Sequence, residues 1–449
     1  MQRRMRPDHS SARAIGKPVG SGAALDPVAA LRHGSRSFLT TTMRIQAFRG
    51  LTPRPDLASQ VAAVPYDVVD TEEARALAAD RPYDLLHVDR AEIDLPPNTD
   101  PYADIVYATA AKNLQRLVSE GILQREAAPV LYLYQQQMGS HIQTGLIAAC
   151  HIDDYGNDII KKHERTRKVK EDDRTRLVDA LSAHTGPIFL TYKDEAAINQ
   201  RVAAILAAEQ PVFDFTAPDG IAHRVWRITG PAPFVAAFAG VDFSYVADGH
   251  HRSASAWRVG TERRAKNPSH NGSEDYNWFL GVLFPGSQLK ILPYNRIVHD
   301  LNALTPGLFL DQVRAAGFTV APTKEKSPSA PGSVHAYLEG KWFALSWDAG
   351  TITDPVESLD VSVLQNRILS PLLGIEDPRT SERIAFIGGI RGTAELEKRV
   401  DSGSAAVAFS MYPTTVAQLM AIADAGQIMP PKSTWFEPKL RSGLVVQTF

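Results

Sequence analysis

The sequence has a single cysteine, Cys150, among 449 residues, and it has almost no net charge. One cysteine excludes an intramolecular disulfide, a cysteine-rich zinc site and an iron–sulfur cluster held by the protein alone. With 48 Lys and Arg against 50 Asp and Glu, the chain is not basic enough overall to coat nucleic acid, so no nucleic-acid partner is expected. No apolar run approaches the roughly 18–20 residues that span a bilayer. These absences predict a soluble, cytoplasmic protein without a membrane partner.

The composition is that of a globular protein, since 44% of the residues are hydrophobic and 22% are charged. At roughly 100–200 residues per domain, the length predicts two to four domains. Cys150 has no basic neighbour that would activate its thiol, so we expect a buried core thiol.

Residues 1–42 differ from the rest of the chain. They contain seven Lys and Arg but two acids, and no periodicity is sustained. We predict a disordered or mis-annotated N-terminal extension here, with a transit peptide as the alternative. Regular structure is expected to begin at Met43.

After Met43, strand-like and helix-like patterns alternate, which predicts a mixed α/β (α+β) fold. A helix is expected to begin at Asp70 or Thr71, and a 3.6-residue apolar period predicts another over residues 101–120. Two hairpins and a further helix are predicted over 130–134 with 145–150, 335–338 with 342–346, and 361–369.

Three regions follow from these patterns. We expect an N-terminal α/β region over 43–150, a central core over 151–321 and a C-terminal α/β region over 322–449. The Pro- and Ser-rich residues 322–332 are the candidate linker.

The segment 243–257 contains the most unusual local pattern. A β-rich run ends at Asp248, Gly249 makes a turn, and a Ser- and Ala-rich segment that favours helix follows. The N–H groups of such a helix start, with His250, His251 and Arg252 beside them, suit an anion such as phosphate. Asp248 would cap the helix or hold one imidazole in a fixed tautomer. The structural alternative is that Asp248 only caps the helix. No metal site is expected, because adjacent histidines rarely converge on one ion.

A second unusual segment, residues 159–176, combines eight basic residues with four acids. A solvated helix face with i,i+4 ion pairs explains such a pattern without any function. The functional alternative is that Glu164, held beside several cations, stays ionised as a general base must. His163-Glu164 lacks the second histidine of a zinc-protease motif, and there is no Walker A loop or strand-linked GxGxxG.

Weaker candidates lie next to prolines that fix the backbone. They are Pro65-Tyr66-Asp67, residues 292–296 and residues 430–434, and from the pattern alone each is interpreted as a structural turn. Possible substrate contacts from these and the charged segment are Arg174, Arg296, Lys432, Ser433 and Thr434.

Taken together, these segments resemble an uncharacterised bacterial family, domain-of-unknown-function family 1015. The resemblance rests on five stretches, in order, between residues 43 and 449: Val64–Val69, Lys162–Thr166 followed by Asp173-Arg174, Thr185–Phe189, Ala247–Ala254 and Met429–Lys439. Asp248–Arg252 is also similar to the phosphate-binding turn of the ParB/sulfiredoxin superfamily, especially of its free-serine kinase branch.

This resemblance implies a ParB/sulfiredoxin-like core in which the turn from Gly249 to Ser253 cradles nucleotide phosphates. His163-Glu164 matches the pair that supplies the catalytic glutamate in that branch, so Glu164 is expected to take a proton from the serine hydroxyl, with His163 and His250 beside it. Two features depart from the pattern. Glu164 and Asp248 are 84 positions apart, which implies an insertion, and Tyr294-Asn295-Arg296 replaces the family's Thr-His-Arg.

The leading hypothesis is a nucleotide-dependent phosphotransferase acting on free serine or a similar small hydroxy compound. Phosphoryl transfer needs positioning and charge neutralisation above all. ADP or ATP is the expected donor, with Mg²⁺ bridging phosphates. A phosphoserine phosphatase and a non-catalytic ParB-like nucleotide-binding switch are the alternatives, and a homo-oligomer remains open.

Overall fold

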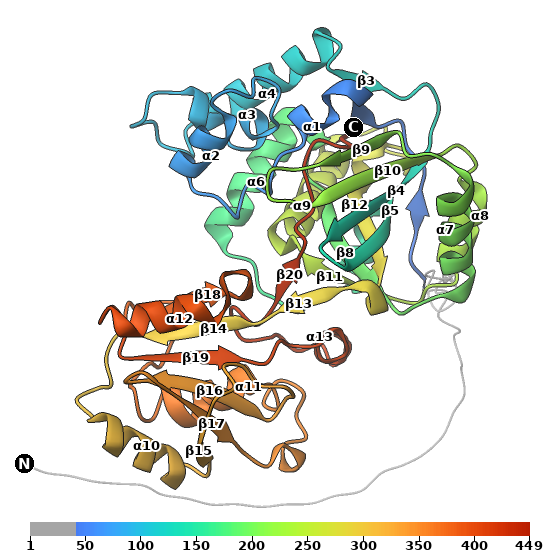
Figure 1. Ribbon diagram of the computed structural model, residues 1–449. Helices are drawn as coiled ribbons and strands as arrows, with labels where there is room; N and C mark the ends of the chain where they lie inside the picture. The colour runs from blue at the N-terminus through green and yellow to red at the C-terminus, as the bar shows by residue number, and fades with distance from the viewer. Residues whose placement is uncertain (1–41) are drawn as a thin grey trace, which may run out of the picture. The chain divides into compact units, whose positions relative to one another are not determined.

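The computed structural model describes residues 42–449 (Figure 1). The predicted N-terminal extension lies outside the described residues, apart from Thr42. None of the helices in the described part is both long and apolar enough to cross a membrane.

A nine-stranded mixed sheet is the larger of two main sheets. Its strands follow the order β6-β11-β8-β12-β5-β4-β10-β9, and β1 pairs with β5 beside this path. They are β1 (Ile45–Gln46), β4 (Leu131–Met138), β5 (His141–His151), β6 (Ile160–Lys161), β8 (Ile188–Tyr192), β9 (Phe213–Thr216), β10 (Ala222–Ile228), β11 (Ser244–Asp248) and β12 (Trp278–Pro285). β4 and β5 form the first predicted hairpin, with Met138 opposite His141.

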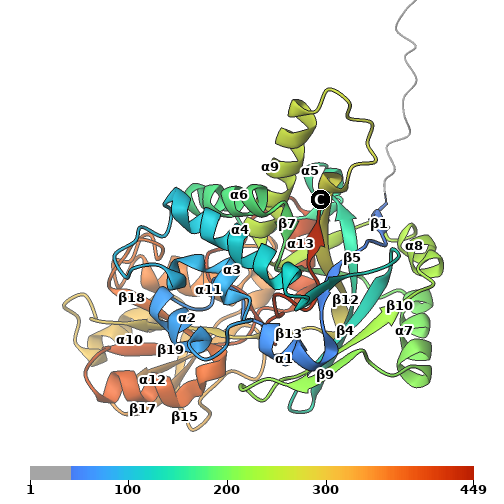
Figure 2. The same cartoon turned by 90° about the horizontal axis from the view of Figure 1, so that it is seen from above.

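Both faces of this sheet are covered, so its central strands are apolar on both sides. In β4, Leu131 and Leu133 join one core cluster while Tyr132 and Tyr134 join another, as the two-residue strand period requires. The first cluster includes side chains of α7 (Ala196–Ala208) and α8 (Ala232–Phe238), which Figure 2 shows beside β10.

A six-stranded antiparallel sheet forms from residues 294–411, in the order β15-β17-β16-β19-β14-β18. Its strands are β14 (Tyr294–Val298), β15 (Thr319–Thr323), β16 (Ser333–Leu338), β17 (Lys341–Ser346), β18 (Ile384–Gly388) and β19 (Val407–Met411). Ile297 packs with Leu396 of α12 (Gly392–Asp401) on one face. Val298 packs with Phe309 of α10 (Pro306–Ala315) on the other. β16 and β17 are the second predicted hairpin.

Three short strand pairs join distant parts of the chain. β2 (Leu51–Pro53) pairs with β3 (Leu123–Arg125), β7 (Ala183–His184) with β21 (Gln447–Thr448), and β13 (Lys290–Leu292) with β20 (Trp435–Glu437). Because β20 and β21 come from the last residues, the C-terminal segment returns to strands formed much earlier in the sequence.

The predicted helices are present with small shifts in their ends. α2 (Thr71–Ala78) begins after Asp70, which forms a capping box with Glu73. α4 covers Asp104–Ser119, and Gly121 follows it with φ 71°. The helix predicted over 361–369 is α11 (Asp360–Leu364) continued by a π-helical turn. The remaining helices are α1 (Ala58–Val61), α3 (Leu86–Asp89), α5 (Ile152–Gly156), α6 (Lys168–Leu181), α9 (His250–Lys266) and α13 (Val416–Asp424).

The mixed α/β fold is therefore confirmed. The boundaries drawn from the sequence do not separate the sheets: position 321/322 falls within β15, and residues 322–332 join β15 to β16, which both pair with β17. Position 150/151 falls at the end of β5, and the large sheet takes strands from both sides of it. Cys150 is fully buried, and burial raises the pKa of its thiol.

Candidate functional site

The turn between β11 and α9 has the predicted strand–turn–helix form. Asp248 ends the strand, and Gly249 adopts φ 96° and ψ 32°, a left-handed conformation that suits glycine. Asp248 Oδ1 accepts a hydrogen bond from the Gly249 amide at 2.9 Å, and no side chain caps α9. The first N–H groups of the helix therefore have no intrahelical acceptor, and they lie at the positive end of the helix dipole, where an anion would be favoured.

Arg252 and Ser253 support this turn from behind. Arg252 Nη1 donates a hydrogen bond to the Pro187 carbonyl, and its guanidinium lies so close to Gly249 that a Cβ there would be 3.1 Å from Nε. Ser253 Oγ donates to the Gly249 carbonyl at 3.1 Å. Neither side chain lines the cavity at the helix start. Of the predicted phosphate-binding residues, Asp248, Gly249, His250 and His251 line it.

Glu164 lies at the same helix end, although 86 positions separate it from His250. Glu164 Oε2 is 3.8 Å from His250 Nδ1, and its side chain is 52% exposed. The ring of His163 is buried and stands perpendicular to that of His250, with centroids 4.5 Å apart. Arg167 donates its backbone N–H to His251 Nε2 at 3.0 Å, which ties the Glu164 segment to α9. The predicted meeting of the two motifs is present.

The ionisation of these groups follows from their surroundings. The cavity walls displace part of the hydration of Glu164, and this desolvation together with the nearby Asp248 carboxylate raises its pKa. Burial lowers the pKa of His163 to about 4 and that of His250 well below its usual range, so both imidazoles are neutral at pH 7. Burial alone would raise the pKa of Asp248, but Lys439 and Arg252 lower it to about 2. Near pH 7, Asp248 is therefore a carboxylate and both histidines are neutral.

These residues line a cavity of about 730 Å³. Its walls come from the chain before α2, the segment between β6 and α6, the β11–α9 turn, the start of β14 and the C-terminal segment. The side chains with charge or hydrogen-bonding groups are Tyr66, Asp67, Asp70, Thr71, Arg90, His163, Glu164, Arg167, Lys170, Asp248, His250, His251, Tyr294, Lys432, Ser433, Thr434, Trp435 and Lys439.

The C-terminal segment contributes two lysines. Lys439 Nζ donates to Asp248 Oδ2 at 3.1 Å and lies 5.3 Å from the Trp435 ring centroid. Lys432 adopts φ 60°, a conformation that non-glycine residues rarely take. Arg296 Nη2 stabilises it by donating to the Lys432 carbonyl at 3.2 Å, and Ser433 Oγ donates to the Pro430 carbonyl at 2.6 Å.

Among the other weak candidates, Tyr66, Asp67 and Tyr294 line the cavity. Arg296, Asn295 and Arg174 do not. Arg296 is buried behind Lys432, and burial lowers its pKa to about 10. Asn295 Oδ1 accepts from the Met411 amide at 3.0 Å, so this side chain belongs to the six-stranded sheet. Asn295 therefore contributes no group to the cavity. Arg174 is buried and stacks at 4.0 Å over the ring of Tyr66, which itself lines the cavity.

A match to a family model covers residues 45–362 of this chain, and the family is described as a protein of unknown function, DUF1015. The chain belongs to the DUF1015 family. The match includes the Glu164 segment and the β11–α9 turn.

The solved structures that match this DUF1015 protein are distant from it, and no curated protein matches it. They include a mutant free serine kinase in complex with ADP, with 14% identity over 65% of this chain and 87% of that one and a TM-score of 0.33. A conserved hypothetical protein from Pyrococcus furiosus shares 15% identity over 66% and 93% of the two chains, with a TM-score of 0.32. SbnI with a C-terminal truncation, from Staphylococcus aureus, shares 10% identity over 66% and 85%, with a TM-score of 0.36. The site is therefore interpreted from its own geometry.

Several residues of the site were not predicted from the sequence. Lys439, Lys170 and Arg90 line the cavity without having been singled out. Lys439 had a signal, because it ends the Met429–Lys439 stretch that resembles the family. Lys170 and Arg90 had none beyond charge, because only the packing of α6 against α3 and α4 brings them to the wall.

Proposed function

We propose that this protein is a cytoplasmic, nucleotide-dependent phosphotransferase that acts on free serine or a similar small hydroxy compound. ADP or ATP is the proposed donor, and Mg²⁺ the proposed metal. The observation that carries the proposal is the position of Glu164, a carboxylate 3.8 Å from His250 at the uncapped start of α9, within a cavity of about 730 Å³. This volume lies in the range of small-molecule sites.

In the proposed reaction, the substrate hydroxyl oxygen attacks the terminal phosphorus of the nucleotide. The new O–P bond forms as the bond from phosphorus to the bridging oxygen breaks, and the shortened nucleotide leaves with that oxygen. Glu164 accepts the hydroxyl proton. A carboxylate with a raised pKa is a better proton acceptor than an ordinary one.

Positive charge at the cavity wall balances the phosphates. The amides at the start of α9 would contact phosphate oxygens, and Lys432, Lys439, Arg167 and Lys170 line the same cavity. Lys439 is partly neutralised by Asp248, whereas Lys432 and Lys170 have no carboxylate partner among the described ion pairs. Preorganised cations and amides of this kind are the main source of catalysis in phosphoryl transfer.

The two buried histidines would orient the reacting groups without adding charge. His250 Nε2 and both ring nitrogens of His163 are buried and have no hydrogen-bond partner within residues 42–449. A buried polar atom without a hydrogen-bond partner is unfavourable, so a ligand or water that bonded to these nitrogens would stabilise the site. We assign His250 a role in holding Glu164 and His163 a role in fixing the ring of His250.

The residues present suit a metal carried by the nucleotide, not a metal held by the protein alone. Within the described part of the chain, no group of three or more His, Cys, Asp or Glu side chains converges as a metal site. Mg²⁺ is commonly held by phosphates, waters and one or two carboxylates. Asp67 lines the cavity and is the carboxylate we assign to it. The metal would neutralise phosphate charge.

The resemblance of His163-Glu164 and Asp248–Arg252 to the free-serine kinase branch supports the same roles for Glu164 and the α9 turn. It also supports serine as the hydroxy compound. Hydrolysis of phosphoserine would use the same groups, with water in place of the nucleotide.

The test is ³¹P NMR of the full-length protein with Mg²⁺ and L-serine, incubated with ADP or ATP in turn. The expected result is a phosphoserine resonance that grows as the nucleotide is shortened and is missing with the Glu164→Gln variant. Phosphoserine alone serves as the control for hydrolysis. If phosphoserine releases inorganic phosphate and neither nucleotide transfers a phosphoryl group to serine, the protein is a phosphatase and not a kinase. Tight nucleotide binding without either reaction would support a switch and overturn the enzyme.

A further inference from the structure

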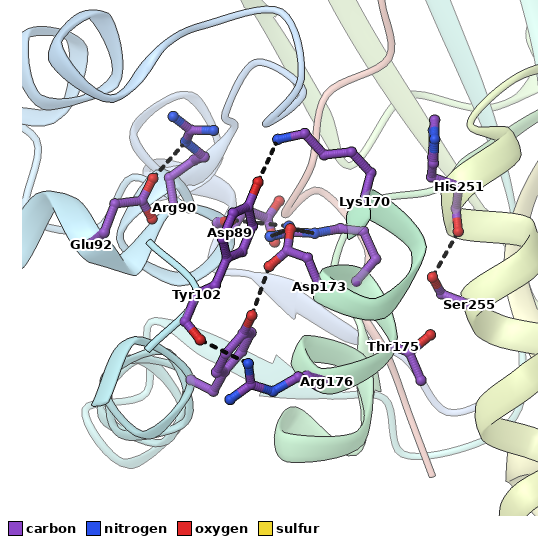
Figure 3. Close-up of polar contacts among 12 residues, drawn as sticks. Asp89, Arg90, Glu92, Tyr102, Lys170, Asp173, Thr175, Arg176, His251 and Ser255 are labelled. Atoms are coloured by element: carbon purple, nitrogen blue, oxygen red, sulfur yellow. Dashed lines mark hydrogen bonds and ion pairs between the residues drawn. The ribbon is translucent and has the colours of Figure 1, made fainter. Parts of the chain in front are cut away.

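A second, smaller cavity of about 170 Å³ adjoins the site (Figure 3). It lies among α3, α4 and the first turns of α6. Tyr66, Thr71, Arg90 and Lys170 line both this cavity and the larger one. The two cavities therefore share a wall, and a molecule in the small one would have one end beside the larger one.

The small cavity is lined by charges of both signs in equal number. Its bases are Arg90, Lys170 and Arg174, and its acids are Asp89, Glu92 and Asp173. A cavity that bound a phosphate would have an excess of bases. Equal numbers of both signs, together with hydroxyl groups of tyrosine and threonine, suit a ligand that carries one positive and one negative group.

Three of these charged groups already have hydrogen-bond partners within the protein. Arg174 Nε donates to Asp173 Oδ2 at 2.9 Å, and Tyr107 Oη donates to Asp173 Oδ1 at 2.9 Å. Asp89 accepts from Thr185 Oγ1 at 2.5 Å. Figure 3 shows the polar contacts around Asp173.

Arg90, Glu92 and Lys170 still have hydrogen-bonding capacity for a ligand. Arg90 Nε is 2.9 Å from Glu92 Oε1, but the contact lacks hydrogen-bond geometry, so Nε is buried without a hydrogen-bond partner in the described chain. Lys170 Nζ, on an exposed residue, donates to Tyr102 Oη at 3.1 Å and has two further protons to donate. Glu92 is buried, and its Oε1 is shared between Arg90 and Thr71.

The size of the cavity matches a small amino acid. At roughly 30 Å³ for each water-sized group, 170 Å³ holds about six such groups. Serine has close to that number of non-hydrogen atoms, whereas a nucleotide has several times more and would need the larger cavity.

We propose that the small cavity binds the phosphoryl acceptor as a zwitterionic hydroxy amino acid. Arg90 and Lys170 bind its carboxylate, and Glu92 binds its ammonium group. Because Arg90 and Lys170 belong to the shared wall, the carboxylate end of the ligand lies there, and we place the neighbouring hydroxymethyl group facing the larger cavity, which Glu164 also lines. The identity of the ligand as the phosphoryl acceptor rests on the proposed function. The requirement for one positive and one negative group rests only on the residues that line the small cavity.

The test is isothermal titration of three ligands into the full-length protein without nucleotide. L-Serine carries both charges, ethanolamine lacks the carboxylate, and 3-hydroxypropionate lacks the ammonium group. Because a hydrogen bond to a charged group is worth roughly a 10- to 100-fold change in affinity, we expect L-serine to bind at least about 10-fold more tightly than either analogue.

Two variants assign the ends of the ligand. Glu92→Gln should weaken L-serine by roughly 10- to 100-fold and leave 3-hydroxypropionate nearly unchanged, because only the ammonium contact is lost. Lys170→Gln should weaken L-serine and leave ethanolamine nearly unchanged. Glu92 lines only the small cavity, so its variant should keep the wild-type affinity for ADP. Lys168→Gln is the matched control, since Lys168 lies on the same helix but pairs with Asp172.

The outcomes separate this inference from the proposed function. Lack of L-serine binding, or binding with the same selectivity in wild type and folded variants, overturns the subsite. Selective L-serine binding without phosphoryl transfer supports the subsite and overturns the kinase. Transfer with a serine KM that Glu92→Gln and Lys170→Gln leave unchanged overturns the subsite alone. If Glu92→Gln does not fold, Lys170→Gln decides, because Lys170 is exposed.

Discussion

At position 164, a half-exposed carboxylate has a raised pKa and a neutral imidazole beside it. The neutral state of His250 matters, because a protonated ring at 3.8 Å would lower the pKa of Glu164 and weaken it as a base. Burial of His250 thus keeps a positive charge away from Glu164, whose own desolvation and the nearby Asp248 raise its pKa.

We expect Glu164→Gln to reduce turnover by roughly 10²–10⁴-fold while nucleotide affinity changes little. Glutamine keeps the size of the side chain but has no basic carboxylate. A coupled assay and isothermal titration measure the two quantities. Glu262→Gln is the control, because Glu262 is exposed on the far part of α9. Near wild-type turnover of Glu164→Gln would mean that residues 159–176 are only a solvated charged segment.

The basic residues near the turn should differ in role: some bind the nucleotide, and others stabilise the turn. Lys432→Gln removes a cation from the cavity and should weaken nucleotide binding by roughly 10-fold at low salt, with a smaller loss as salt rises. The sequence alone predicted this behaviour for Arg252. Because Arg252 is bonded to Pro187 under Gly249, Arg252→Ala should mainly lower the melting temperature. Calorimetry with ADP at several salt concentrations distinguishes the two, with Lys266→Gln as the exposed control.

At the scale of the elements, the start of α9 depends on the conformation of one residue. Gly249→Ala would place a Cβ in a left-handed backbone and 3.1 Å from Arg252 Nε. We expect the free energy of unfolding to fall by about 1–3 kcal/mol and the nucleotide affinity to fall with it. Urea unfolding measures the first and calorimetry the second.

Gly121 provides the matched control. It also has a left-handed backbone, φ 71°, but nothing lies within 4 Å of its Cβ position. Gly121→Ala should therefore show the backbone cost alone, about 1 kcal/mol, with wild-type nucleotide affinity. Equal losses in the two variants, with ADP binding intact in both, would mean that the α9 turn does not contact the nucleotide.

Local signals could be read from the sequence, and contacts between distant segments could not. Asp248-Gly249 before a helix-favouring run predicts its turn because each step is local. The directions of Arg252 and Ser253 depend on which side of α9 faces the core, and the short segment does not fix this. Lys170 and Arg90 reach the cavity only through helix packing. The six-stranded sheet was divided by the predicted boundary because residues 322–332 look like a linker while joining two strands of one sheet.

For the whole molecule, buried neutral histidines predict an acid-sensitive stability. Burial lowers the pKa of His223 to about 3, while an unfolded histidine has a pKa near 6.5. Between these values the unfolded chain binds the proton and the folded chain does not, so this contribution is fully present above pH 6.5 and declines as the pH falls.

Relative to His223→Gln, the wild type should lose about 2 kcal/mol of unfolding free energy between pH 7 and pH 5. The difference between the two proteins cancels the carboxylates, which titrate in both. Urea unfolding at a series of pH values gives both curves. Parallel curves would show that His223 is protonated in the folded protein, or that water reaches its unpartnered Nε2.

Because the C-terminal segment returns to the cavity, the protein should acquire nucleotide binding late in folding. Lys439 reaches Asp248 across 191 positions, and its carbonyl accepts a hydrogen bond from Gln136 across 303. Contacts between such distant residues form late, because closing long loops is slow. In refolding from denaturant, binding of a fluorescent ADP analogue should therefore recover with the slowest phase, after most of the tryptophan signal. Recovery of binding in a fast phase would mean that the helix and Glu164 segments bind nucleotide before the last residues have docked.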